Sequence, residues 1–394
     1  MRGLCQYLQV SESHILYRKE PYIDPRIYGQ CSPGVVQPKV QKVIRNLPVA
    51  PFKVLDAPNL RDDFYCSVLA YCAIRKTLAV GLDDQLYAWS ESQGVVLLAS
   101  GPPRLPRTTS DAWLTSVAFS SERGEKAILA TGRADGTLSL LSLFDSSMPR
   151  FEIQQPCPVA CVAWRPVPIA RPSKSPVMSS KHVMTEDLIV GDEMGTVYYY
   201  IVEWPTVEDY HNTGWSGLTT LVARISTHTQ QICGLAWSSN GSLFASGGND
   251  NLCLLYNVEQ VLRPNTPRKA GTGADNIDST RQAYTDTGRV EPLLDGTELQ
   301  RWSHGAAVKA IAFCPWQPTL VATGGGSNDK CIHFFHTTSG ACLATISVSA
   351  QVTSLIWSST RREIAATFGY AQPEHPIRIA VFSWPDCKQV AAIP

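Results

Sequence analysis

The stretch ICGLAWSSNGSLFASGGNDNLCLLYNV, residues 232–258, decides the fold. It contains three short apolar runs, separated by the polar segments SSNGS (238–242) and NDN (249–251). Alternation of apolar and polar residues with period two predicts β-strands, and clusters of Ser, Asn, Asp and Gly between such runs predict turns. The stretch is therefore typical of a meander of short antiparallel strands.

The same order of strand, polar turn, glycine-ending strand, polar turn and third strand recurs from Ser67 onward. Six copies are found, at 67–90, 114–143, 159–204, 232–258, 308–340 and 352–384. Repeats of about 40–45 residues made of short strands are typical of propeller blades, which cover one another's faces when they stack radially. The sequence predicts an all-β WD-repeat β-propeller with six visible blades. We expect either a six-bladed ring or a ring whose seventh blade is missing or incomplete.

The predicted propeller occupies residues 53–394 as one domain. Two segments, at about 168–186 and 259–301, interrupt the repeats and are rich in Pro, Ser, Thr, Gly and charged residues. Such composition is typical of surface loops or disordered insertions. Residues 1–52 have weak periodicity and many prolines, and we expect an extended or disordered segment there.

Composition excludes several classes of protein. The chain has 394 residues, 44% of them hydrophobic, and a formal net charge of zero, which does not favour binding to nucleic acid or to a membrane surface. No apolar run approaches the roughly 20 residues of a membrane span, and the N-terminus lacks the apolar core of a signal peptide. Twelve cysteines without a secretion signal indicate reduced thiols in the cytosol or nucleus.

Ser, His and Asp recur together in a way that suggests a hydrolase triad. A catalytic set is not normally copied from blade to blade, so the repetition favours structural hydrogen-bond networks, and we expect no catalytic residues. The repeated sets are His228, Ser246 and Asp250 in the fourth copy, and His304, Thr323 and Asp329 in the fifth.

Metal and nucleotide motifs also fail on spacing. Cys157 and Cys161 do not have the Cys-x-x-Cys spacing of a zinc knuckle. His333 and His336 are three apart on a predicted strand and point to opposite faces. The glycine-rich segment 324–330 lacks the Gly-Lys-Ser/Thr of a P-loop. We therefore expect no metal and no cofactor.

Several segments together resemble the fizzy and fizzy-related activators of the anaphase-promoting complex, over residues 51–394. Copies two and three, with their insertions, are more similar to the meiosis-specific fungal branch of that family. The segments are KVLDAPNLRDDFY (53–65), GGNDN (247–251), HGAAVKAIAFCPWQP (304–318), ATGGGSNDKCI (322–332), AQVTSLIWS (350–358) and FGYAQPEHPI (368–377).

The resemblance implies a non-enzymatic subunit of the nucleus and cytoplasm. Its partners would be the anaphase-promoting complex and substrates of cell-cycle or meiotic ubiquitination that carry degrons, the short motifs marking proteins for degradation. The Lys-Glu-Asn degron would bind one end of the propeller, where amides can pair with its residues without a fixed charge. The implied contacts are Asn249, Asn251, Ser327 and Gln351.

The resemblance also implies a groove between the first and last blades for the destruction box, Arg-x-x-Leu. Asp63, with Asp62 nearby, would pair with its arginine. The family's N-terminal docking box and C-terminal Ile-Arg tail are not found, since the chain ends in Ile393-Pro394. The alternatives are a general WD-repeat scaffold for another complex and an enzyme that uses the central channel.

Overall fold

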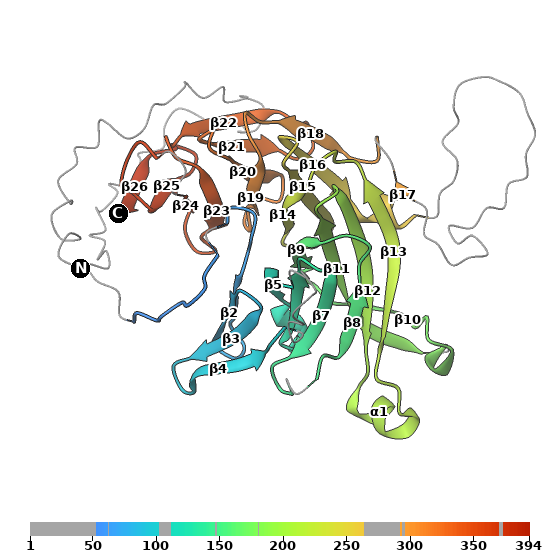
Figure 1. Ribbon diagram of the computed structural model, residues 1–394. Coiled ribbons are helices and arrows are strands. Elements are labelled where there is room, and N and C mark those ends of the chain that lie inside the picture. The colour runs from blue at the N-terminus through green and yellow to red at the C-terminus, as the bar shows by residue number, and fades with distance from the viewer. Residues whose placement is uncertain are drawn as a thin grey trace, which may run out of the picture.

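The computed structural model describes residues 53–61, 63–101, 112–145, 148–179, 181–263, 292–293, 296–369 and 373–394. Within these ranges the chain forms six sheets arranged around a common centre (Figure 1). The prediction of an all-β propeller with six blades is confirmed. The predicted N-terminal segment, 1–52, lies outside the described residues.

Five of the sheets have four antiparallel strands each, joined in chain order. The first sheet contains β1 (Leu69–Cys72), β2 (Thr77–Leu82), β3 (Gln85–Ser90) and β4 (Gly94–Ala99). The second contains β5 (Leu114–Phe119), β6 (Ile128–Arg133), β7 (Thr137–Ser142) and β8 (Phe151–Gln154). The fourth contains β14 (Ile232–Trp237), β15 (Leu243–Gly248), β16 (Leu252–Asn257) and β18 (Gln300–Ser303). The fifth contains β19 (Val308–Phe313), β20 (Leu320–Gly325), β21 (Cys331–His336) and β22 (Cys342–Ser347). The sixth and last contains β23 (Val352–Trp357), β24 (Glu363–Phe368), β25 (Ile379–Ser383) and β26 (Gln389–Ile393).

The third sheet is larger and corrects one prediction. It contains β9 (Val159–Trp164), β10 (Ile169–Pro172), β11 (His182–Asp192), β12 (Thr196–Trp204), β13 (Leu218–Ser226) and β17 (Pro292–Leu293). The segment 168–186 is therefore not simply a surface loop, because β10 pairs with the first half of β11. The polar residues of this segment had indicated a loop, but Arg171 donates to the buried carboxylate of Asp187 inside the sheet.

The second predicted insertion, 259–301, is described only at its ends. They contribute most of helix α2 (Val258–Leu262), β17 and the start of β18. Helix α1 (Val207–Thr213) joins β12 to β13, and short 3-10 turns lie at Glu122–Gly124 and Pro176–Met178. No helix in the described ranges has the length and apolar character needed to cross a membrane.

Tryptophans at the ends of inner strands connect neighbouring sheets. The indole N–H of Trp237 donates to the Ala163 carbonyl of the preceding sheet at 3.2 Å, and Trp357 donates to Ala312 at 3.0 Å. Trp164 repeats the contact with Ala118 at 3.1 Å. A buried indole needs a partner for its N–H, so this contact explains why several copies carry Trp at the same position.

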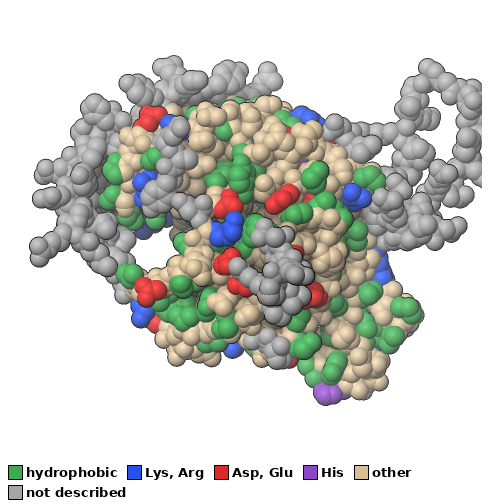
Figure 2. Space-filling model, in the orientation of Figure 1, with side chains coloured by type: hydrophobic (Ala, Val, Ile, Leu, Met, Phe, Trp, Pro, Cys, Tyr) green, Lys and Arg blue, Asp and Glu red, His purple; other side chains and the backbone are tan. Residues whose placement is uncertain are grey.

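The first and last sheets each have a face that no other described sheet covers, and they stand apart at the left of Figure 1. On the first sheet the open face carries apolar side chains in register across four strands, and hydrophobic side chains show there in Figure 2. Its most exposed members are Leu69, Tyr71, Val95 and Leu97, which are 64%, 60%, 58% and 49% exposed. The opposite face buries Leu86 completely against the second sheet.

Candidate functional site

Four predicted site residues lie at one end of the ring, and the topology explains why. In a four-stranded meander, the turn between the second and third strands opens at the same end as the connection to the next sheet. Asn249 and Asn251 occupy such a turn between β15 and β16, and Ser327 occupies the matching turn between β20 and β21. Gln351 directly precedes β23, in the connection from the fifth sheet to the sixth.

The turn between β15 and β16 is locked by its central aspartate. Asp250 accepts hydrogen bonds from Nδ1 of His228 at 2.9 Å and from the amide of Thr229 at 3.0 Å. Burial alone would raise the pKa of the Asp250 carboxyl, but these hydrogen bonds hold the pKa below its ordinary value. Asn251 has a φ of 67°, in the left-handed region that asparagine tolerates better than most residues. The sequence Asn-Asp-Asn therefore builds the turn without a glycine.

Asn249 flanks this locked aspartate with its amide held in one orientation. Its Oδ1 accepts a hydrogen bond from the Tyr65 hydroxyl at 2.8 Å, and its Nδ2 donates to Oε1 of Gln230 at 2.8 Å. An amide oxygen has two lone pairs and an amide nitrogen has two hydrogens. These two bonds therefore leave one acceptor position and one donor hydrogen available for a ligand.

A basic residue fixes the segment that carries Tyr65. Lys309, on β19 of the fifth sheet, donates from Nζ to the carbonyl oxygens of Phe64 and Cys66, the latter at 2.6 Å. Burial lowers the pKa of the Lys309 ammonium below its ordinary value. The same lysine lines a central cavity of about 190 Å³, bordered by residues of all six inner strands or their approaches. The segment before β1 is thereby tied to the fourth and fifth sheets at the channel.

Asp63 lies in the same segment before β1 as Tyr65. Its Oδ1 accepts from the amide of Tyr65 at 2.8 Å, and its Oδ2 accepts from the thiol of Cys66 at 3.5 Å. Asp63 is exposed, so its carboxylate is accessible to a ligand. Its electrostatic neighbours also include Lys309 and Glu193, from the fifth and third sheets. Asp63 is thus connected to the asparagine turn through Tyr65, which bonds to both Asp63 and Asn249, while Asp62 lies outside the described residues.

Ser327 and Gln351 share the end of the ring but not the hydrogen-bond network. Among the described residues, no side-chain hydrogen bond connects either of them to Asn249 or Asn251. Ser327 is half-buried and Gln351 is 8% exposed. The backbone carbonyl of Gln351 accepts a hydrogen bond from the amide of Gly369. The side chain of Gln351 packs closely on this glycine, because a Cβ added at Gly369 would lie only 2.5 Å from Oε1 of Gln351.

The Ser/Thr-His-Asp sets form hydrogen bonds within their sheets, and the set of the fourth sheet is complete. In the fourth sheet, Nε2 of His228 bonds to the hydroxyl of Ser246 at 2.7 Å while Nδ1 bonds to Asp250. Ser246 and its counterpart Thr323 are 0% exposed, so neither hydroxyl can reach a substrate from solvent. The geometry supports a network that joins strands to turns.

Comparisons with known proteins give the family. A family model described as "WD domain, G-beta repeat" matches residues 219–257. Meiotic fizzy-related protein 2 of Schizosaccharomyces pombe is 29% identical over 93% of this chain, and the meiosis-specific APC/C activator protein AMA1 of Saccharomyces cerevisiae is 29% identical over 87%. The chain belongs to the fizzy-related family of WD-repeat proteins. An uncharacterised WD repeat-containing protein of S. pombe is 34% identical over 87% of this fizzy-related chain.

The fizzy-related chain spans only part of these relatives. It covers 51% of the uncharacterised protein, 59% of the fizzy-related protein and 52% of AMA1. In structure, it is similar to a chain of the mitotic checkpoint complex, with 26% identity and a TM-score of 0.60. That match covers 91% of this chain and 89% of the other.

Proposed function

We propose that the chain is a degron-binding and activating subunit of the anaphase-promoting complex, acting in the degradation of cell-cycle or meiotic proteins. The observation that carries this proposal is the asparagine turn, in which the Asn249 amide is oriented by two hydrogen bonds and left half available. The names of the relatives, an APC/C activator among them, support the choice of ligase.

The site has the chemistry needed for a Lys-Glu-Asn peptide. The free donor and acceptor of Asn249 suit the side-chain amide of the peptide asparagine, and the exposed amide of Asn251 offers further donors to the glutamate. The accessible carboxylate of Asp63, next to Tyr65, suits the peptide lysine. We propose Ser327 and Gln351 as further contacts for the Lys-Glu-Asn motif.

Recognition of the destruction box is a separate proposal. Arginine–carboxylate pairing would use Asp62 and Asp63, as the sequence implies. Because Tyr65 connects Asp63 to the asparagine turn, we propose that this one carboxylate serves either motif. We therefore expect Lys-Glu-Asn and Arg-x-x-Leu peptides to compete if both assignments hold.

The experiment is a fluorescence anisotropy titration of a labelled Lys-Glu-Asn peptide with the full chain. The Asn249→Ala/Asn251→Ala double variant should lose at least about tenfold in affinity, because each amide contact contributes roughly 1 kcal/mol. Asn212→Ala is the matched control, since Asn212 is exposed on α1, away from the turns at this end. Equal binding by the wild type and the double variant would refute the assignment.

A general WD-repeat scaffold is the remaining alternative. It predicts that the folded wild type ignores both the Lys-Glu-Asn and the Arg-x-x-Leu peptides. A scrambled peptide of the same composition, titrated beside the true motif, separates sequence-specific recognition from simple charge attraction.

A further inference from the structure

The fifth sheet departs from the regular network of the fourth. In the fourth sheet, Asp250 bonds to Nδ1 of His228. In the fifth sheet, the equivalent Asp329 bonds instead to Nε2 of His333, at 2.9 Å. Nδ1 of His304 is then buried with no hydrogen-bond partner, although Nε2 of His304 keeps its bond to Thr323 at 2.7 Å. Leaving a buried nitrogen without a hydrogen bond costs stability, so the pairing of Asp329 with His333 instead of His304 needs an explanation.

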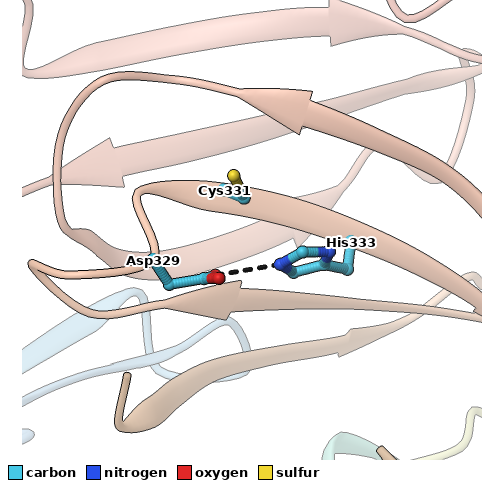
Figure 3. Close-up of side chains that lie close together, drawn as sticks. All are labelled: Asp329, Cys331 and His333. Atoms are coloured by element: carbon cyan, nitrogen blue, oxygen red, sulfur yellow. Dashed lines mark hydrogen bonds and ion pairs between the residues drawn. The ribbon is translucent and has the colours of Figure 1, made fainter. Parts of the chain in front are cut away.

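Asp329 lies close to Cys331 and His333, so three side chains that can bind a metal ion come together here. Cys331 and His333 are two apart on β21 and therefore share one face of the strand. Asp329 ends the turn that leads into this strand, and Figure 3 shows its carboxylate facing the imidazole of His333. One oxygen, one sulfur and one nitrogen of these residues all lie within 4.8 Å of one another.

We propose that Asp329, Cys331 and His333 bind a divalent metal ion of borderline softness, with Zn²⁺ as the physiological choice. A thiolate, an imidazole and a carboxylate together suit Zn²⁺ better than Mg²⁺ or Ca²⁺, which take oxygen ligands. Bonds of about 2.0–2.3 Å to a tetrahedral ion space its ligand atoms roughly 3.3–3.8 Å apart. The present separations of up to 4.8 Å must shorten to reach that spacing, and water can supply a fourth ligand.

Neighbouring groups orient the carboxylate of Asp329 and the imidazole of His333. The amide of Gly305 donates to Oδ1 of Asp329 at 3.1 Å, which leaves Oδ2 toward the group. Nδ1 of His333 bonds to the hydroxyl of Thr345 at 3.2 Å, which leaves Nε2 toward the group. Outer partners of this kind orient metal ligands and select the imidazole tautomer. All three ligand residues are partly exposed, so an ion can enter from solvent.

The test is titration of the metal-free full chain with Co²⁺, a spectroscopic substitute for Zn²⁺, followed by displacement with Zn²⁺. We expect one equivalent of Co²⁺ to produce a thiolate-to-cobalt charge-transfer band that Zn²⁺ abolishes. Cys331→Ser should remove the band and weaken binding at least about tenfold. The matched control is Cys387→Ser, which removes a partly exposed thiol of the last sheet and should leave the band unchanged.

A second variant keeps the test independent of folding effects. Thr345→Val leaves all three ligands in place but removes the partner of His333, and should weaken Zn²⁺ binding about tenfold while the cobalt band persists. The proposal is overturned if the wild type shows no thiolate band with Co²⁺. It is equally overturned if folded Cys331→Ser, with a native circular dichroism spectrum, keeps the wild-type band and affinity.

Discussion

At the residue scale, the proposed function depends on how a few polar side chains are held. Asn249 lies in a turn that the sequence marks clearly, because Asn-Asp-Asn interrupts two apolar strands. The hydrogen bond from Tyr65, however, spans 184 positions of the chain, and no local pattern predicts it. For the same reason the sequence implied a destruction-box role for Asp63 but could not show its connection to the asparagine turn through Tyr65.

Tyr65→Phe tests whether the amide of Asn249 is preorganised. Loss of one hydrogen bond of about 1 kcal/mol should weaken Lys-Glu-Asn peptide binding about fivefold, less than the loss in Asn249→Ala. The measurement is the anisotropy titration, with thermal unfolding as a check on the fold. Unchanged affinity would show that Tyr65 does not position the amide.

Asp63→Asn tests the role of the exposed carboxylate. We expect weaker binding of the Lys-Glu-Asn peptide, with a reduced dependence on salt, because the charge opposite the peptide lysine is removed. The Arg-x-x-Leu peptide is titrated in parallel. If only that second peptide loses affinity, Asp63 serves the destruction box and not the asparagine turn.

At the scale of the element, the sequence predicted the first three strands of each sheet far better than the fourth. The first three carry the Trp or Phe, the small residues and the polar turns that mark a copy, whereas outer strands such as β8 and β18 have four residues each and no such marks. The expectation of no metal site rested in part on the histidine pair His333 and His336, whose spacing of three points them to opposite faces, whereas Cys331 and His333 are two apart and share one face.

The buried pair His228–Asp250 makes a pH-dependent contribution to the fourth sheet. Because the folded pKa of Asp250 lies below the ordinary 3.8, the pair stabilises the fold above that pH and loses its effect as the pH falls through the folded pKa. Asp250→Ala should cost about 1–3 kcal/mol at pH 7 in urea unfolding. The difference from the wild type should shrink below about pH 4, and a constant difference would contradict this account.

At the scale of the whole molecule, the first and last of the described sheets each have an open face, and that of the first sheet is apolar. The six copies in the sequence predicted either a six-bladed ring or a ring whose seventh blade is missing or incomplete. Leu86 and Leu97 provide a matched pair on opposite faces of the first sheet, with exposures of 0% and 49%. Their contributions to stability report directly on what covers each face.

Leu86→Ala should cost about 2–5 kcal/mol, because it leaves a cavity against the second sheet. Leu97→Ala should cost less than about 1 kcal/mol, because its side chain is half exposed. Urea unfolding of both variants in the full chain is the measurement. Equal costs would show that the open face of the first sheet is covered in solution.

The central claim is that one end of the propeller, at the asparagine turn, binds Lys-Glu-Asn peptides. The most direct measurement is photo-crosslinking of such a peptide, with a photoreactive residue next to the motif, to the full chain and mapping by mass spectrometry. We expect crosslinks in the turns around 249–251 and 327–330 and near 351, and their loss in the Asn249→Ala/Asn251→Ala variant. Crosslinks at the opposite end, in turns such as 239–242 or 337–340, or no specific crosslinks at all, would contradict the claim.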